Sequence, residues 1–84
     1  MTKYEKELQQ LKDWDEVQDT GVCKFSGYPF IYTAGHGYLA IPSNDKNYAL
    51  AYKICSYGFK GRLAVYLEED CEAPQFIKEL GLYN

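Results

Sequence analysis

Two short segments of the chain hold the residue types that do chemistry. The only histidine, His36, lies between two glycines in TAGHG, residues 33 to 37, and acids surround a cysteine in YLEEDCE, residues 66 to 72. Imidazole, carboxylate and thiol groups bind metal ions, transfer protons and act as nucleophiles. Whether this chain has such an activity therefore depends on whether the two segments meet in the fold.

A metal site is the first chemistry to consider, because His36, Glu68, Glu69, Asp70 and Cys71 are all competent ligands. An imidazole and two carboxylates would converge if the turn at His36 met the end of the later strand. The spacing does not require this, since neighbouring residues on an extended chain point to opposite faces. We therefore predict no metal and no cofactor, with His36 and Glu69 as the ligands if a metal is bound.

A cysteine nucleophile is the second possibility. Cys71 lies where a helix is predicted to begin, and a helix N-terminus favours the thiolate. His36 could activate it, oriented by Asp70 or Glu69. The surrounding carboxylates oppose this, because their charge raises the pKa of the thiol. We predict no catalytic residue, and keep a hydrolytic role for His36 with Glu68, Glu69 or Cys71 as an alternative.

Both segments also have a structural explanation. Gly35 and Gly37 predict a tight turn around His36 in which positive φ values are required. The acids before the last helix would complement the positive end of its dipole. A phosphate-binding loop is disfavoured, because TAGHG lacks the lysine and the strand-loop-helix context that such loops use.

The elements that must position these segments follow from periodicity and turn residues. Residues 2 to 12 predict an amphipathic helix with Thr2 and Glu5 as a capping box, and Trp14 is the expected anchor of the loop that follows. Three strands, at 21 to 25, 28 to 34 and 37 to 41, predict an antiparallel meander in which Pro29 starts a strand or lies at an edge.

The second half of the chain predicts a helix, a strand and a helix. Ser43 is the expected N-cap of a helix that ends at Gly58 and buries Cys55 as a core residue. Residues 62 to 68 alternate as a strand with Leu63, Val65 and Leu67 on one side. Residues 70 to 81 form the last helix, ending at Gly81.

The order α-β-β-β-α-β-α predicts one α+β domain over residues 1–84, with helices packed on a three- to four-stranded, mostly antiparallel sheet.

Charge and cysteine content limit the partners. The net charge of −3 argues against a nucleic-acid ligand, which needs clustered Lys and Arg. No apolar run approaches the roughly 20 residues that cross a bilayer, so we expect no membrane partner. Three cysteines without C-x-x-C spacing and without a signal-peptide-like stretch indicate a reducing, cytoplasmic setting.

TAGHG and EEDCE together resemble an uncharacterised domain family of phage, plasmid and other mobile-element proteins. The likeness covers residues 30–80. The first motif is matched by Thr33, Gly35, His36 and Gly37, and the second by Glu68, Glu69, Asp70, Cys71 and Glu72. The resemblance implies a mobile-element origin and one shared feature built from both motifs, and it implies no activity.

These observations favour a small acidic, non-enzymatic interaction protein over an enzyme. The expected partner is a basic surface of a bacterial host protein, for example a defence nuclease such as a CRISPR effector, and the chain itself is expected to be a monomer or a homodimer in the cytoplasm of that host. Tyrosines 28, 32 and 57 are further candidate anchors, and the residues predicted to make the contact are Tyr38, Tyr66, Glu68, Glu69, Asp70 and Glu72.

Overall fold

The computed structural model describes residues 2–12, 16–23 and 26–81, which form a small α+β domain with three helices and five strands. Trp14 lies outside the described residues. In chain order the elements are α1 (Lys3–Leu11), β1 (Val17–Val22), β2 (Pro29–Thr33), β3 (Gly37–Pro42), α2 (Tyr48–Ile54), β4 (Phe59–Lys60), β5 (Ala64–Glu68) and α3 (Glu72–Glu79).

The strands form one antiparallel sheet in the order β1-β2-β3-β5-β4. The predicted meander of the first three strands is confirmed, and Pro29 is the first residue of its strand. The first strand begins earlier than predicted, at Val17, and the sheet has five strands instead of three or four. The additional strand, β4, has two residues, too few to show any periodicity.

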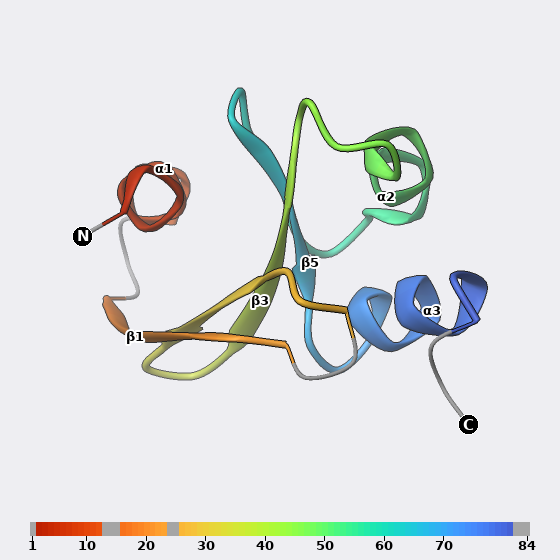
Figure 1. Ribbon diagram of the computed structural model, residues 1–84. Coiled ribbons are helices and arrows are strands. Elements are labelled where there is room, and N and C mark those ends of the chain that lie inside the picture. Colours follow the sequence, from red (N-terminus) through yellow and green to blue (C-terminus); the bar gives the residue numbers. More distant parts are fainter. Residues whose placement is uncertain (1, 13–15, 24–25, 82–84) are drawn as a thin grey trace.

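Helices cover both faces of the sheet, as Figure 1 shows, with α1 on one side and α2 and α3 on the other. On the α1 side, Leu8 packs with Ile31 and Tyr66, and on the opposite side Leu39 and Leu67 pack with Phe76. The described helices include none that is both long and apolar enough to cross a membrane.

The strand β5 is buried on both faces because it lies between β3 and β4 under helices on each side. Tyr66, predicted on the side opposite Val65 and Leu67, is therefore fully buried as they are. Leu63, predicted within the strand on the same side as Val65 and Leu67, instead precedes the strand and is 37% exposed.

The helix α2 is shorter than predicted at both ends. It begins at Tyr48 after Asn47, so Ser43 is not its N-cap, and its C-cap is Cys55, so Gly58 does not end it. The difference at the N-terminal end follows from Asp45, whose carboxylate accepts hydrogen bonds from the Tyr28 hydroxyl at 2.6 Å and from the Asn47 N–H at 2.9 Å. These bonds hold the preceding residues in turns.

The other two helices match their predictions more closely. Both hydrogen bonds of the Thr2–Glu5 capping box are present in α1. Gly81 follows α3 with a φ of 73°, the left-handed conformation expected of a glycine that ends a helix. Cys55 is buried as predicted, and burial raises the pKa of its thiol to about 11.

The carboxylate of Glu7 joins α1 to the turn that enters β5. It accepts hydrogen bonds from the backbone N–H groups of Arg62, Leu63 and Ala64 and from the Tyr66 hydroxyl at 2.7 Å. Burial alone would raise the pKa of Glu7, but these four donors outweigh it and lower the pKa below 4.5.

This lowered pKa predicts that Glu7 stabilises the fold above about pH 4.5 and that the contribution disappears as the pH falls through the folded-state pKa. We expect Glu7→Gln to lower the free energy of unfolding at neutral pH by about 1–3 kcal/mol. The amide NH₂ group of glutamine would face backbone N–H donors that the carboxylate now accepts. Urea unfolding at pH 7 and at acid pH measures this, with the exposed Glu79→Gln as control. Equal losses in both variants would contradict the assignment.

Candidate functional site

The two segments that hold the reactive residues meet at one end of the sheet. The turn between β2 and β3 contains His36, and β3 pairs with β5 so that Tyr38 lies opposite Glu68. Beyond the last pair, the Glu69 N–H donates to the Gly37 carbonyl at 3.0 Å. TAGHG and EEDC therefore form one contiguous structure, which the sequence spacing alone left open.

His36 and Glu68 lie close together at this end. The His36 Nδ1 lies 3.6 Å from the Glu68 Oε1, with the histidine side chain 53% exposed and the glutamate side chain 11% exposed. Glu68 Oε2 accepts the Asp70 N–H at 3.2 Å, whereas the buried Oε1 has no hydrogen-bond partner. The imidazole thus lies over a buried carboxylate oxygen.

Thr33 fixes the turn that carries His36. Its hydroxyl donates to the His36 carbonyl at 3.1 Å, and the His36 N–H lies 3.3 Å from the same oxygen. Lys12, which is buried, approaches the hydroxyl from α1 with its Nζ at 3.4 Å and lies 4.9 Å from the centre of the Tyr38 ring. Sequence reasoning missed Lys12, because a lysine at a helix end is normally solvated.

Of the two glycines that flank His36, only Gly37 is explained by the structure, through lack of space and not through backbone conformation. Neither has positive φ, contrary to prediction. At Gly37 a Cβ would lie 2.5 Å from the Phe30 ring and 2.9 Å from the Glu69 carboxylate, so a larger residue here would displace these two side chains. At Gly35 a Cβ would meet nothing within 4 Å.

Cys71 is the N-cap residue of α3 and is exposed. Partial desolvation, a hydrogen bond to Glu68 and the charges of Glu68, Glu72 and Asp70 all raise the pKa of its thiol. The carboxylates therefore oppose formation of the thiolate, as the sequence indicated. Within the described residues, no three or more His, Cys, Asp or Glu side chains gather into a group that could hold a metal ion.

Most residues predicted to contact a partner are buried. Tyr38 and Tyr66 are 4% and 0% exposed, and Glu68 and Glu72 are 8% and 3% exposed. The prediction that these four present a docking surface is wrong. Tyr38, Tyr66 and Glu68 lie on the inner strands β3 and β5, and the carboxylate of Glu72 on α3 is directed at backbone N–H groups. Glu69 is half-buried and Asp70 is exposed.

The carboxylate of Glu72 has a structural role instead. It accepts the N–H groups of Ser56 and Gly58 at 2.9 Å each, that of Glu68 at 3.2 Å, and that of Tyr57. Three consecutive backbone N–H groups before β4, those of residues 56 to 58, therefore share this one side chain as their acceptor. The sequence pattern could not predict this role of Glu72, because most of the N–H groups that it accepts are 14 to 16 residues away.

An exposed tyrosine between two acids lies on the same end of the sheet. Asp19 of β1 pairs with Tyr32 of β2, and Tyr32 pairs with Gly37, which bonds to Glu69. Residues paired across a sheet direct their side chains to the same face. Asp19, Tyr32 and Glu69 therefore form a row on one face, which we call the acidic row. Tyr32 is 46% exposed and Asp19 is exposed. Asp19 also accepts the Thr20 N–H at 2.8 Å.

The chain matches no protein-family model, no curated protein and no solved structure.

Adjacent acids at this site are expected to differ sharply in their effect on stability. Glu72→Ala should lower the free energy of unfolding by about 2 kcal/mol or more, because the buried N–H of Glu68 and three part-buried N–H groups lose their acceptor. Asp70→Ala, at an exposed position, should change it by about 0.5 kcal/mol or less. Denaturant unfolding of both variants measures this, and a Glu72→Ala variant as stable as Asp70→Ala would show that the carboxylate does not hold the loop.

Proposed function

We propose that this chain is a small, non-enzymatic interaction protein that docks its acidic row on a basic surface of a bacterial host protein. The observation that supports this most directly is the cross-strand placement of Tyr32 between Asp19 and Glu69. Tyrosine is enriched among residues that dominate interface energies, and flanking carboxylates select a partner with Lys or Arg.

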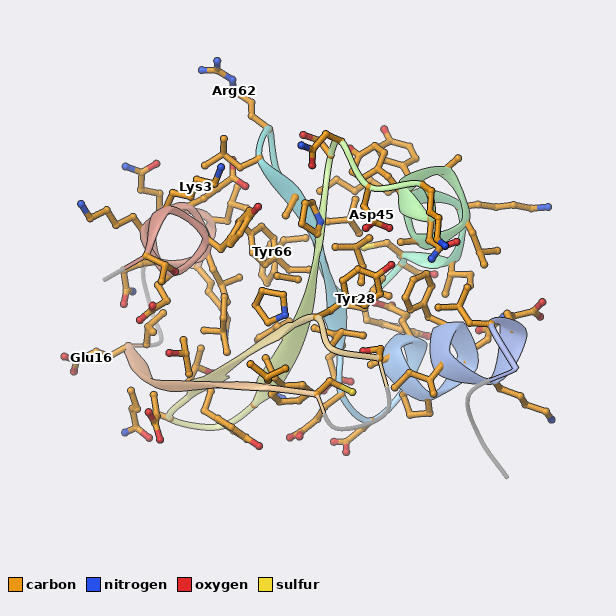
Figure 2. All side chains as sticks on the ribbon, in the orientation of Figure 1. Lys3, Glu16, Tyr28, Asp45, Arg62 and Tyr66 are labelled. Carbon is orange, nitrogen blue, oxygen red and sulfur yellow. The ribbon has the colours of Figure 1, made fainter. Side chains whose placement is uncertain are left out.

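Further acids extend the acidic row in both directions. Glu16 immediately precedes β1, whose Val17 lies opposite Thr33, and its side chain projects away from the body of the molecule (Figure 2). Asp70 follows Glu69 in the exposed turn before α3. This end of the sheet lies away from α2 (Figure 1).

The mobile-element origin in this proposal rests on the two motifs that resemble the phage and plasmid domain family. Their convergence at one sheet end supports the idea that the motifs form one feature. A small acidic protein from such an element would act by binding and blocking a host protein, for example a defence nuclease such as a CRISPR effector. The burial of Tyr38 and Tyr66 moves the tyrosine anchor to Tyr32.

Reversing one charge of the acidic row tests the docking proposal. Tagged wild-type protein is used to capture partners from a bacterial lysate at low and at high salt, and the partner lost at high salt is purified. We expect Asp19→Lys and Asp70→Lys each to weaken its affinity about tenfold, because each places a like charge against the partner.

The matched control is Glu79→Lys, which makes the same charge change at an exposed position of α3. Its affinity should stay close to that of the wild type. A partner that binds all three variants equally, or the absence of any partner lost at high salt, would refute docking through the acidic row.

The His36–Glu68 pair favours one second candidate, a small hydrolytic domain. With Nδ1 directed at a buried carboxylate, the imidazole has Nε2 left for proton transfer, the arrangement of a general base. Cys71 has no part in this reading, since the pKa of its thiol is raised.

If the chain hydrolyses an ester, peptide or phosphodiester, His36→Ala should lower the rate by about 10²-fold or more. The thermal midpoint should change little because the histidine side chain is half exposed. Cys71→Ala should keep the rate. Turnover of a panel of chromogenic substrates measures both variants, and activity that survives His36→Ala would exclude this candidate.

A further inference from the structure

A second charged surface lies between α1 and the turn that connects β4 to β5. A groove of about 350 Å³ is lined there by Lys3, Lys6, Glu7, Gln10, Arg62 and Leu63. Figure 2 shows Lys3 on α1 and Arg62 on the turn on the same side of the molecule, with Arg62 extending into solvent. The groove is therefore a concentration of basic side chains on a chain whose net charge is −3.

The groove's carboxylate, that of Glu7, already accepts hydrogen bonds from the protein itself. Glu7 directs its carboxylate to the backbone N–H groups of Arg62, Leu63 and Ala64 and to the Tyr66 hydroxyl. Within the part of the chain that the structure describes, neither Lys6 nor Arg62 forms an ion pair through its side chain. These cations therefore have no role in holding the fold that the structure shows.

The basic residues of the groove come from two elements. Lys3 and Lys6 are about 4.5 Å apart along the axis of α1 at 1.5 Å per residue, and Arg62 lies on the turn before β5. Cations spread over two elements suit a ligand with several acids, such as an extended peptide whose alternate side chains are about 7 Å apart. A single phosphate would instead need its donors to converge on one point. Leu63, 37% exposed, offers an apolar contact beside them.

We propose that this groove binds an extended acidic segment of a partner protein, with carboxylates on Lys6 and Arg62. Arg62 can hold a carboxylate through two parallel N–H bonds, which fixes the direction of the segment. Arg62 precedes β5 and Glu69 follows it, so the groove and the acidic row lie at opposite ends of this strand. Both surfaces can therefore be occupied at the same time.

The experiment uses a fluorescein-labelled acetyl-(Glu-Leu)₃-amide peptide and fluorescence anisotropy with the full chain at low salt. We expect saturable binding that Lys6→Glu and Arg62→Glu each weaken about tenfold. Lys78→Glu, an exposed lysine of α3, is the matched control and should bind as the wild type does. Thermal unfolding confirms that the exposed substitutions leave the fold intact.

Two results would overturn the proposal. One is the absence of saturable peptide binding to the wild type, or equal peptide affinity of Lys6→Glu, Arg62→Glu and Lys78→Glu. The other is displacement of the peptide by inorganic phosphate at a lower concentration than by unlabelled peptide, which would identify a phosphate site instead. Asp19→Lys should leave peptide binding undiminished, so failure here and failure of docking through the acidic row are separate outcomes.

Discussion

The architecture depends on two carboxylates that accept backbone hydrogen bonds on either side of β5. The segments that enter and leave this strand carry backbone N–H groups that are not paired within the sheet and need acceptors. Glu7 satisfies the turn before the strand, and Glu72 satisfies the last residue of the strand and the loop between α2 and β4. Each carboxylate also ties a helix to the sheet, so packing and hydrogen bonding reinforce one another.

This arrangement explains which parts of the fold could be predicted. The capping box of α1, the meander and the glycine end of α3 are local signals, and all three are present in the structure. Glu7 and Glu72 give no such signal, because a carboxylate whose donors are 14 or 55 residues away looks like any solvated acid. The N-cap assigned to Ser43 fails for the same reason, since the distant Tyr28 engages Asp45.

The candidate site was predictable in its residue types but not in its exposure. TAGHG and EEDC were singled out by composition, and their meeting follows from the pairing of β3 with β5 across an intervening helix, which no local pattern specifies. Alternation along residues 62 to 68 implied one solvated face, whereas helices cover both faces. The alternation therefore assigns Tyr66 and Glu68 to the surface although both are buried, whereas Tyr32 on β2 is 46% exposed.

The hydrogen bond from the Thr20 N–H to the Asp19 carboxylate lies at the edge of the sheet. The strand β1 is the first strand of the sheet, and an edge strand with free donors is a template for pairing with another chain. Asp19 occupies one of these donors and places a charge beside it. The same carboxylate therefore disfavours fibrous self-association along β1, so a substitution that removes it is expected to make the protein less soluble.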